Sequence, residues 1–131
     1  MNLGMLIETA LRMMTKRFVH NAYNSGVDIS LDQWQVLGPI WQLKSPSQKE
    51  LGEICLKDKA SITRIVDSLE KKSLVVRIAD QIDHRIKRVV LTNLGKQLFY
   101  DVLPIMEKTR EEGRGDISED QIVIFKNAES N

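Results

Sequence analysis

Apolar residues recur at three- and four-residue intervals through the first part of the chain. This spacing predicts an amphipathic helix over residues 3–24, which Ser25 and Gly26 bring to an end. The apolar positions of this helix are Leu3, Leu6, Ile7, Ala10, Leu11, Met14, Phe18 and Ala22.

A second helix is predicted over residues 31–43. Ser30 and Gln33 stand at the spacing of a capping box, which closes the first turn of a helix. The apolar face includes Trp34, Leu37 and Trp41. Pro39 lies inside the segment and has no backbone donor, so a kink or an early end is expected there.

Two short helices joined by a tight turn are predicted next. Ser47 and Glu50 form another capping box and begin the first of them. Its inward residues are expected to be Leu51, Ile54 and Cys55. Asp58 can cap the second, which ends near Lys72. Its apolar stripe holds Ile62, Ile65, Val66 and Leu69, and the opposite face carries Ala60, Arg64, Asp67 and Lys71.

Two β-rich runs, residues 74–79 and 86–91, predict a hairpin because a short polar connection separates them. Thr92 can cap a long helix that ends near residues 113–115. The apolar positions of that helix are Leu94, Leu98, Phe99, Val102 and Met106. A last short helix is predicted over residues 118–125.

This order of elements predicts a mainly α fold with a small β-hairpin wing. We expect a winged helix-turn-helix lobe over residues 30–92, within a single domain of residues 1–131. The N- and C-terminal helices, in residues 1–26 and 93–131, are expected to form a dimerisation region. Their apolar faces lie at opposite chain ends and can pack together across a two-fold axis.

The formal net charge of +1 conceals an uneven distribution of charge. Residues 44–92 hold 11 Lys or Arg against 7 Asp or Glu, whereas the rest of the chain holds 8 against 11. A basic middle between acidic ends suits contact with a polyanion, although charged runs are more often solvated surface. Charge alone therefore decides little.

Residues 47–92 resemble the MarR family of bacterial regulators, and a looser resemblance extends over nearly all of the chain. Residues 61–72 are similar to the family's recognition-helix region, and residues 74–77 match its Leu-Val-x-Arg signature. Residues 83–85 match its Asp-x-Arg wing motif, and residues 91–92 match its Leu-Thr entry to the next helix.

The resemblance implies a homodimeric, sequence-specific transcription regulator that binds double-stranded DNA at a palindromic operator. Repression relieved by a small-molecule effector is the family's expected mode, but the sequence identifies neither effector nor operator. A winged helix that contacts proteins without binding DNA is the alternative. Ser73 stands where the family has glycine, so the corner after the recognition helix is expected to be built differently.

Outward side chains near the start of a recognition helix meet base edges and phosphates in the major groove. The residues predicted to contact DNA from this helix are Lys59, Ser61, Thr63 and Arg64. Asp67 is predicted to orient Arg64 or a wing arginine, since an acid on this face is unsuited to contact. The alternative is an exposed Arg64 that merely pairs with Asp67 or Glu70.

The hairpin tip is predicted to enter the minor groove through Arg85, where the negative potential is greatest in narrow A·T-rich stretches. Asp83 is expected to fix the direction of Arg85. His84 is a weaker candidate for DNA contact, and Lys87 with Arg88 can assist at the DNA backbone. A charged hairpin without any partner is the alternative.

For many family members the resemblance implies a small-molecule cavity between the DNA-binding lobe and the dimerisation helices. The residues predicted to line it are Phe18, His20, Tyr23, Trp34 and Trp41. Aromatic residues at helical spacing are more often plain core, so packing alone is the alternative interpretation. Cys55 is predicted to pack in the core.

The residue content argues against an enzyme. Two His, one Cys and no glycine-rich phosphate loop offer neither a catalytic constellation nor a metal or cofactor site. No apolar run suits a membrane span or a secretory leader, and a single cysteine cannot form an internal disulfide. We expect a cytoplasmic protein that does not contact membranes.

Overall fold

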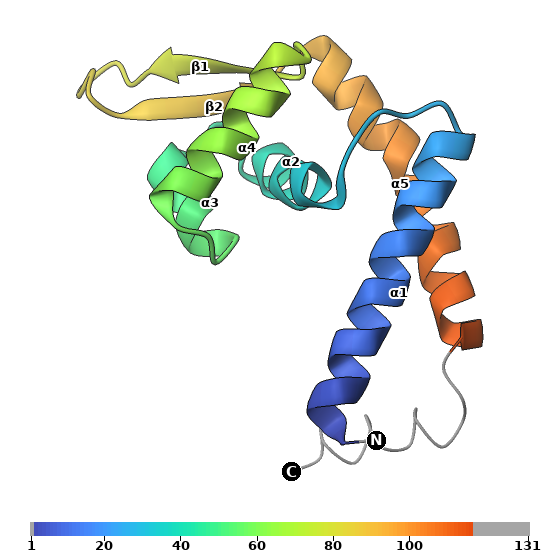
Figure 1. The fold of residues 1–131 in the computed structure, drawn as a ribbon. Helices are drawn as coiled ribbons and strands as arrows, with labels where there is room; N and C mark the ends of the chain where they lie inside the picture. Colours follow the sequence, from blue (N-terminus) through green and yellow to red (C-terminus); the bar gives the residue numbers. More distant parts are fainter. Residues whose placement is uncertain (1, 117–131) are drawn as a thin grey trace. The chain divides into compact units, whose positions relative to one another are not determined.

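A computed structural model describes residues 2–116, and the helix predicted over residues 118–125 lies outside them. The elements are α1 (Leu3–Asn24), α2 (Leu31–Leu43), α3 (Gln48–Ile54), α4 (Lys59–Lys71), β1 (Val75–Ala79), β2 (Lys87–Leu91) and α5 (Asn93–Asp116). Figure 1 follows them along the chain. The mainly α fold with a hairpin wing, predicted from the sequence, is confirmed.

The helix boundaries follow from the capping residues. These are Ser30 with Gln33 at α2, Ser47 with Glu50 at α3, Asp58 at α4 and Thr92 at α5. Each side chain accepts a hydrogen bond from a backbone N–H that has no partner inside its own helix. Because the signal is local, the sequence predicted where each of these helices begins.

Pro39 does not end α2, which continues to Leu43. Proline has no N–H, so the carbonyl of Gln35, one turn earlier, loses its usual helical donor. The thiol of Cys55 takes that place, with its Sγ atom 3.8 Å from the Gln35 oxygen. Cys55 is half-buried, and burial raises the pKa of its thiol. The neutral thiol therefore donates to Gln35, which gives Cys55 a structural role.

Contacts divide the chain into two compact units, one of residues 29–102 and one that joins residues 1–28 to the chain from Leu103 onward. The core of the first unit is aliphatic, and its fully buried members are Val36, Leu37, Ile40, Leu51, Ile62, Val66, Leu69, Val75 and Val89. At its edge Phe99 is stacked between Trp34 and Trp41, with ring centroids 5.2 and 4.8 Å away.

Two apolar residues at helix ends are exposed, although Ile54 is predicted to face inward and Leu94 to lie on the apolar face of its helix. Ile54 is 52% exposed and Leu94 is 56% exposed. Ile54 is the last residue of the seven-residue α3, and Leu94 lies in the first turn of α5. Helical spacing assigns such end residues to the apolar face, but the neighbouring elements do not extend far enough to cover them.

In the second unit, α1 packs beside the later part of α5 (Figure 1), and polar side chains fix their pairing. The amide nitrogen of Asn21 donates to Thr109 Oγ1 at 3.0 Å and to Glu112 Oε1 at 2.9 Å. Arg17 pairs with the second oxygen of Glu112 at 3.0 Å. Asn21 and Thr109 are buried, so a shift of one helix along the other would leave them unsatisfied.

The hairpin is antiparallel, with Val75 opposite Leu91 and Ala79 opposite Lys87. The far edge of β2 is also paired, because Val89 N donates to the carbonyl of Pro46 at 2.9 Å and Ser47 forms a bridge with Arg88. The linker before α3 thus acts as a third, very short strand, and β2 lies between two neighbours.

Ser73 occupies the left-handed corner after α4, with φ at 61°. Leu74 N donates to Leu69 O and Ser73 N donates to Glu70 O, the two hydrogen bonds of a Schellman motif. The expectation of a differently built corner is therefore wrong: serine adopts the conformation that glycine usually provides.

We expect Ser73→Gly to stabilise the protein by about 0.5–1 kcal/mol, because glycine adopts positive φ without steric cost. Thermal or urea unfolding measures the change. The control Lys71→Gly, at an exposed position within α4, should destabilise by a similar amount. Equal loss of stability in both variants would contradict the assignment of strain to Ser73.

Candidate nucleic-acid interface

The start of α4 presents the first group of predicted contacts. Asp58 caps the helix by accepting from Ser61 N at 2.7 Å, and this backbone hydrogen bond lowers the pKa of the Asp58 carboxyl. Lys59 and Arg64 are exposed, and Ser61 is half-exposed. The Nη2 atom of Arg64 donates to Ser61 Oγ at 3.3 Å. Within residues 2–114 Arg64 forms no ion pair, so its charge is available to a partner.

The acids of α4 are paired with the wing. Arg77, on β1, contacts Asp67 at 2.7 Å and Glu70 at 3.1 Å. Its guanidinium also donates to Gln48 Oε1 and to the carbonyl of Thr63. The alternative pairing of Arg64 with Asp67 or Glu70 is therefore not formed. Both acids are neutralised by an arginine of the hairpin, which reduces their repulsion of a polyanion.

Thr63 is less free than its position in the sequence suggests. Its hydroxyl donates to the carbonyl of Lys59 at 2.8 Å and accepts from Gln48 Nε2 at 2.8 Å. The residue thereby joins α3 to α4 and sets the spacing of the two helices. One lone pair remains for an outside donor.

At the wing tip both carboxylate oxygens of Asp83 accept hydrogen bonds from the Arg85 guanidinium, at 3.0 Å from Nε and 3.1 Å from Nη2. Asp83 also accepts from the backbone N–H of Arg85. The guanidinium holds the pKa of the Asp83 carboxyl below its usual range. The Arg85 side chain is nonetheless 91% exposed, so the pair aims a charged group into solvent. His84 and Lys87 are exposed beside it.

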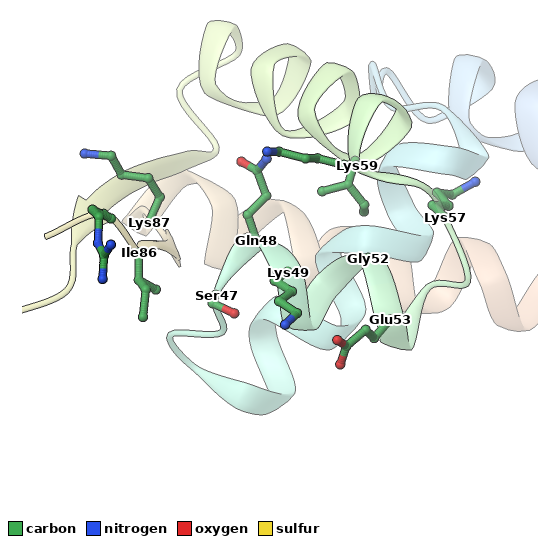
Figure 2. A pocket seen from close by; sticks show the side chains of 11 residues that line it. Ser47, Gln48, Lys49, Gly52, Glu53, Lys57, Lys59, Ile86 and Lys87 are labelled. Atoms are coloured by element: carbon green, nitrogen blue, oxygen red, sulfur yellow. The ribbon is translucent and has the colours of Figure 1, made fainter. Parts of the chain in front are cut away.

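A groove of about 680 Å³ lies between α3, the start of α4 and the wing. Figure 2 shows side chains from all three segments around it. Its cationic residues are Lys49, Lys57, Lys59, Arg85 and Lys87, against a single carboxylate, Glu53. We call it the α3–wing groove. A smaller hollow, lined by Ser61, Arg64 and Lys57, lies on the other side of the α4 start.

The residues predicted to line a ligand cavity belong to different units. Trp34 and Trp41 stack on Phe99 in the first unit. In the second unit Phe18 is fully buried, whereas His20 and Tyr23 are exposed on α1. His20 shares a hydrogen bond with the amide of Asn24 at 3.0 Å. A cavity formed by these five residues stays a prediction.

Among residues 2–116, no cluster of three or more His, Cys, Asp or Glu side chains is arranged to hold a metal ion. The helices of that part of the chain include none long and apolar enough to cross a bilayer.

The comparison with known families decides the class of the wing-bearing region, because residues 29–87 match the MarR family. This segment is a MarR-family domain. Regulators of this family are generally DNA-binding proteins rather than enzymes. The match covers the groove, α4 and the wing tip, and it ends within β2.

Solved structures of similar fold align with nearly all of this chain. The reduced form of MarR from E. coli has a TM-score of 0.81 and 24% identity, covering 99% of this chain and 95% of that one. A MarR mutant from E. coli in complex with operator DNA has a TM-score of 0.76 and 21% identity, covering 98% and 88%. BpsR from Bordetella bronchiseptica, whose DNA binding is regulated by 6-hydroxynicotinic acid, has a TM-score of 0.81 and 20% identity, covering 99% and 94%.

Within the MarR-family domain, sequence reasoning missed three residues of the α3–wing groove. Gln48, Lys49 and Lys57 line it together with predicted residues Lys59, Arg85 and Lys87. The excess of basic residues between 44 and 92 was the only signal for the two lysines. Their place at the ends of α3 becomes visible only when the hairpin folds back over that helix.

Proposed function

We propose that this chain is a transcription regulator that binds duplex DNA through α4 and the wing. The observation that carries the proposal is the α3–wing groove, which gathers five cationic side chains from three segments and only one carboxylate. Pairing of Asp67 and Glu70 with Arg77 reduces the repulsion of a polyanion by the recognition helix. In this proposal Lys59, Lys87 and the groove lysines contact phosphates, and Ser61 and Arg64 face base edges and the phosphates beside them.

Fluorescence anisotropy with labelled duplexes tests DNA binding. We expect specific binding to a duplex that the protein selects from random sequence, and weaker binding to a scrambled duplex of equal length. A protein-contact module would bind neither, and that result would support the alternative interpretation of the winged helix.

The affinity for DNA should fall steeply with salt. If Lys59, Arg64, Arg85 and Lys87 of two subunits neutralise roughly six to eight phosphates, log K should fall with log salt at a slope of about −5 to −7. Titrations between low and moderate salt measure this slope. A flat dependence would mean that the basic groove serves solubility only.

We propose that the regulator acts as a homodimer formed by the terminal helices, in residues 1–26 and 93–131. Ile7, Leu11, Val19 and Tyr23 lie four or eight residues apart on α1, so each is near the next around the helix and the four form a stripe that winds along it. Their exposed fractions lie between 48% and 82%. A stripe of exposed apolar side chains along a helix is typical of an interface between subunits.

Introducing charge into this stripe should break the dimer without unfolding the subunit. We expect Leu11→Glu with Val19→Glu to raise the dimer dissociation constant at least about tenfold, because carboxylates would be buried at the interface. Light scattering over a concentration series measures it. Arg12→Gln, a change at an adjacent exposed position, is the control. A wild-type chain that stays monomeric at micromolar concentration, with normal DNA binding, would contradict the dimer.

Repression of a palindromic operator, released by a small acidic or aromatic effector, is the mode we propose for the dimer. Two structures of the same fold support it in part, since one holds operator DNA and the other comes from a protein regulated by 6-hydroxynicotinic acid. An effector would favour the state of the dimer that it binds more tightly. If the two recognition helices lie at a different distance in that state, the dimer no longer fits the operator. Reporter expression in a deletion strain distinguishes repression from activation.

A further inference from the structure

Arg88 on β2 contacts three segments at once. Its Nε atom donates to Asp80 Oδ1 at 2.7 Å, and its Nη1 atom donates to the carbonyl of Ser45 at 3.1 Å. The same Nη1 atom lies 3.6 Å from Glu50 Oε1. The side chain is 36% exposed, and its two hydrogen bonds hold the Nε and Nη1 atoms of the guanidinium in place.

Asp80, at the base of the wing loop, uses its other carboxylate oxygen to hold the tip. Asp80 Oδ2 accepts from the backbone N–H of Ile82 at 3.1 Å and from that of Asp83 at 3.0 Å. The Asp83 side chain in turn accepts two hydrogen bonds from the Arg85 guanidinium. A continuous series of hydrogen bonds therefore runs from Arg88 through Asp80 and Asp83 to Arg85.

The other end of the series is the start of α3. Ser45 precedes that helix, and Glu50 completes its capping box with Ser47. Gln48 and Lys49, which lie between Ser47 and Glu50, line the α3–wing groove together with Arg85. Arg88 thus connects the two walls of the groove, and its charge is balanced by Asp80 at 2.7 Å.

We propose that Arg88 is a positioning residue that fixes the wing tip relative to α3 and does not itself contact DNA. This proposal rests on the proposed DNA binding, and it replaces the backbone contact predicted for Arg88 from the sequence. Hydrogen bonds to the Asp80 carboxylate, from the Asp83 amide first and then from Arg88, lower its pKa to about 2. Its stabilising effect is present above the ordinary carboxyl pKa and disappears only as the pH falls through about 2, so the clamp stays closed at neutral pH.

The test compares Arg88→Ala, Asp80→Ala and the double variant in DNA binding, with Lys87→Ala as the control on the same strand. We expect each single variant to lose about tenfold in affinity for DNA. The double variant should lose no more than the weaker-binding single variant, because both substitutions break the same Arg88–Asp80 interaction. The salt slope should stay at the wild-type value for all three. Lys87→Ala should reduce the slope by about one per subunit.

A phosphate contact by Arg88 would give the opposite pattern. Asp80→Ala would then keep or raise affinity, because it frees a cation, and Arg88→Ala would reduce the salt slope. Arg88→Lys separates the two possibilities even if the alanine variants fold poorly. Lysine keeps a phosphate contact, but its single nitrogen cannot replace both the Nε and the Nη1 atoms that bond Asp80 and Ser45, so we expect it to lose affinity.

Amide exchange in the free protein tests the clamp without DNA. We expect Arg88→Lys to speed exchange of the Ile82 and Asp83 amides at least about fivefold, and Lys87→Ala to leave them unchanged. Failure of the wild type to bind any duplex would refute the proposed function. Amide exchange would still test whether Arg88 holds the wing tip in place, because it is measured without DNA. Unchanged exchange in Arg88→Lys, or tighter DNA binding by Asp80→Ala, would overturn the proposal.

Discussion

Replacing Arg85 with alanine should lower operator affinity at least about a hundredfold and leave the fold intact. The Arg85 side chain is 91% exposed and, within residues 2–114, bonds only to Asp83 of the same loop, so the loss of stability should stay within about 0.5 kcal/mol. Removing one charged interaction with DNA from a half-site costs on the order of 1–3 kcal/mol, and a dimer bears this cost twice.

Two further variants sharpen this result. Asp83→Ala should give a smaller loss in the same direction, because Arg85 keeps its charge but loses its bidentate support. Gln81→Ala, an exposed change in the same loop, serves as the control and should bind like the wild type. Operator titration and thermal melting are measured on all three. Unchanged affinity of Arg85→Ala with a normal melt would show that the wing does not read DNA.

Gly95→Ala should strongly destabilise the fold. A methyl group at Gly95 would fall on the backbone oxygen of Leu74 and within 3.2 Å of Leu91 Cδ2. A backbone oxygen cannot move aside as a flexible side chain can, so the hairpin and the start of α5 would have to separate. We expect a loss on the order of 3 kcal/mol, or about 10 °C in melting temperature.

The matched control for this change is Gly4→Ala. It lies in the first turn of α1, where a methyl group would be 3.5 Å from Asn2 Oδ1, an ordinary contact. Alanine favours helix, so this variant should be neutral or slightly stabilised. Denaturant unfolding compares the two, and a Gly95→Ala protein as stable as Gly4→Ala would contradict the close packing of α5 on the corner before β1.

The parts of the fold that depend on local chemistry could be predicted from the sequence. Capping side chains lie within three residues of the amides they bond, so Ser30, Ser47 and Asp58 mark helix starts without any knowledge of the tertiary structure. The hairpin was equally predictable, because β-rich runs flank a polar turn. The exposed ends, Ile54 and Leu94, were not, since their burial depends on how far neighbouring elements reach.

The candidate site was predictable only in part, for the same reason. Motif position identified Arg85 and Asp83, whose pairing is local. Arg77 bonds to Asp67, ten residues earlier, and Gln48 bonds to Thr63, fifteen residues later, so these links arise only when the hairpin and α3 pack against α4. In the sequence Arg88 is one more basic residue, because its bond to the Ser45 carbonyl, 43 residues earlier, exists only in the folded chain.

Selection of binding sites from a pool of random duplexes tests most directly whether the chain is a dimeric DNA-binding regulator. We expect enrichment of an inverted repeat whose half-sites are centred about 10 base pairs apart, one helical turn, with A·T-rich sequence where the wings lie. The Arg85→Ala protein should lose the preference in the A·T-rich positions first. A pool that shows no enrichment with the wild-type protein, or only a single unrepeated half-site, would contradict a dimeric DNA-binding regulator.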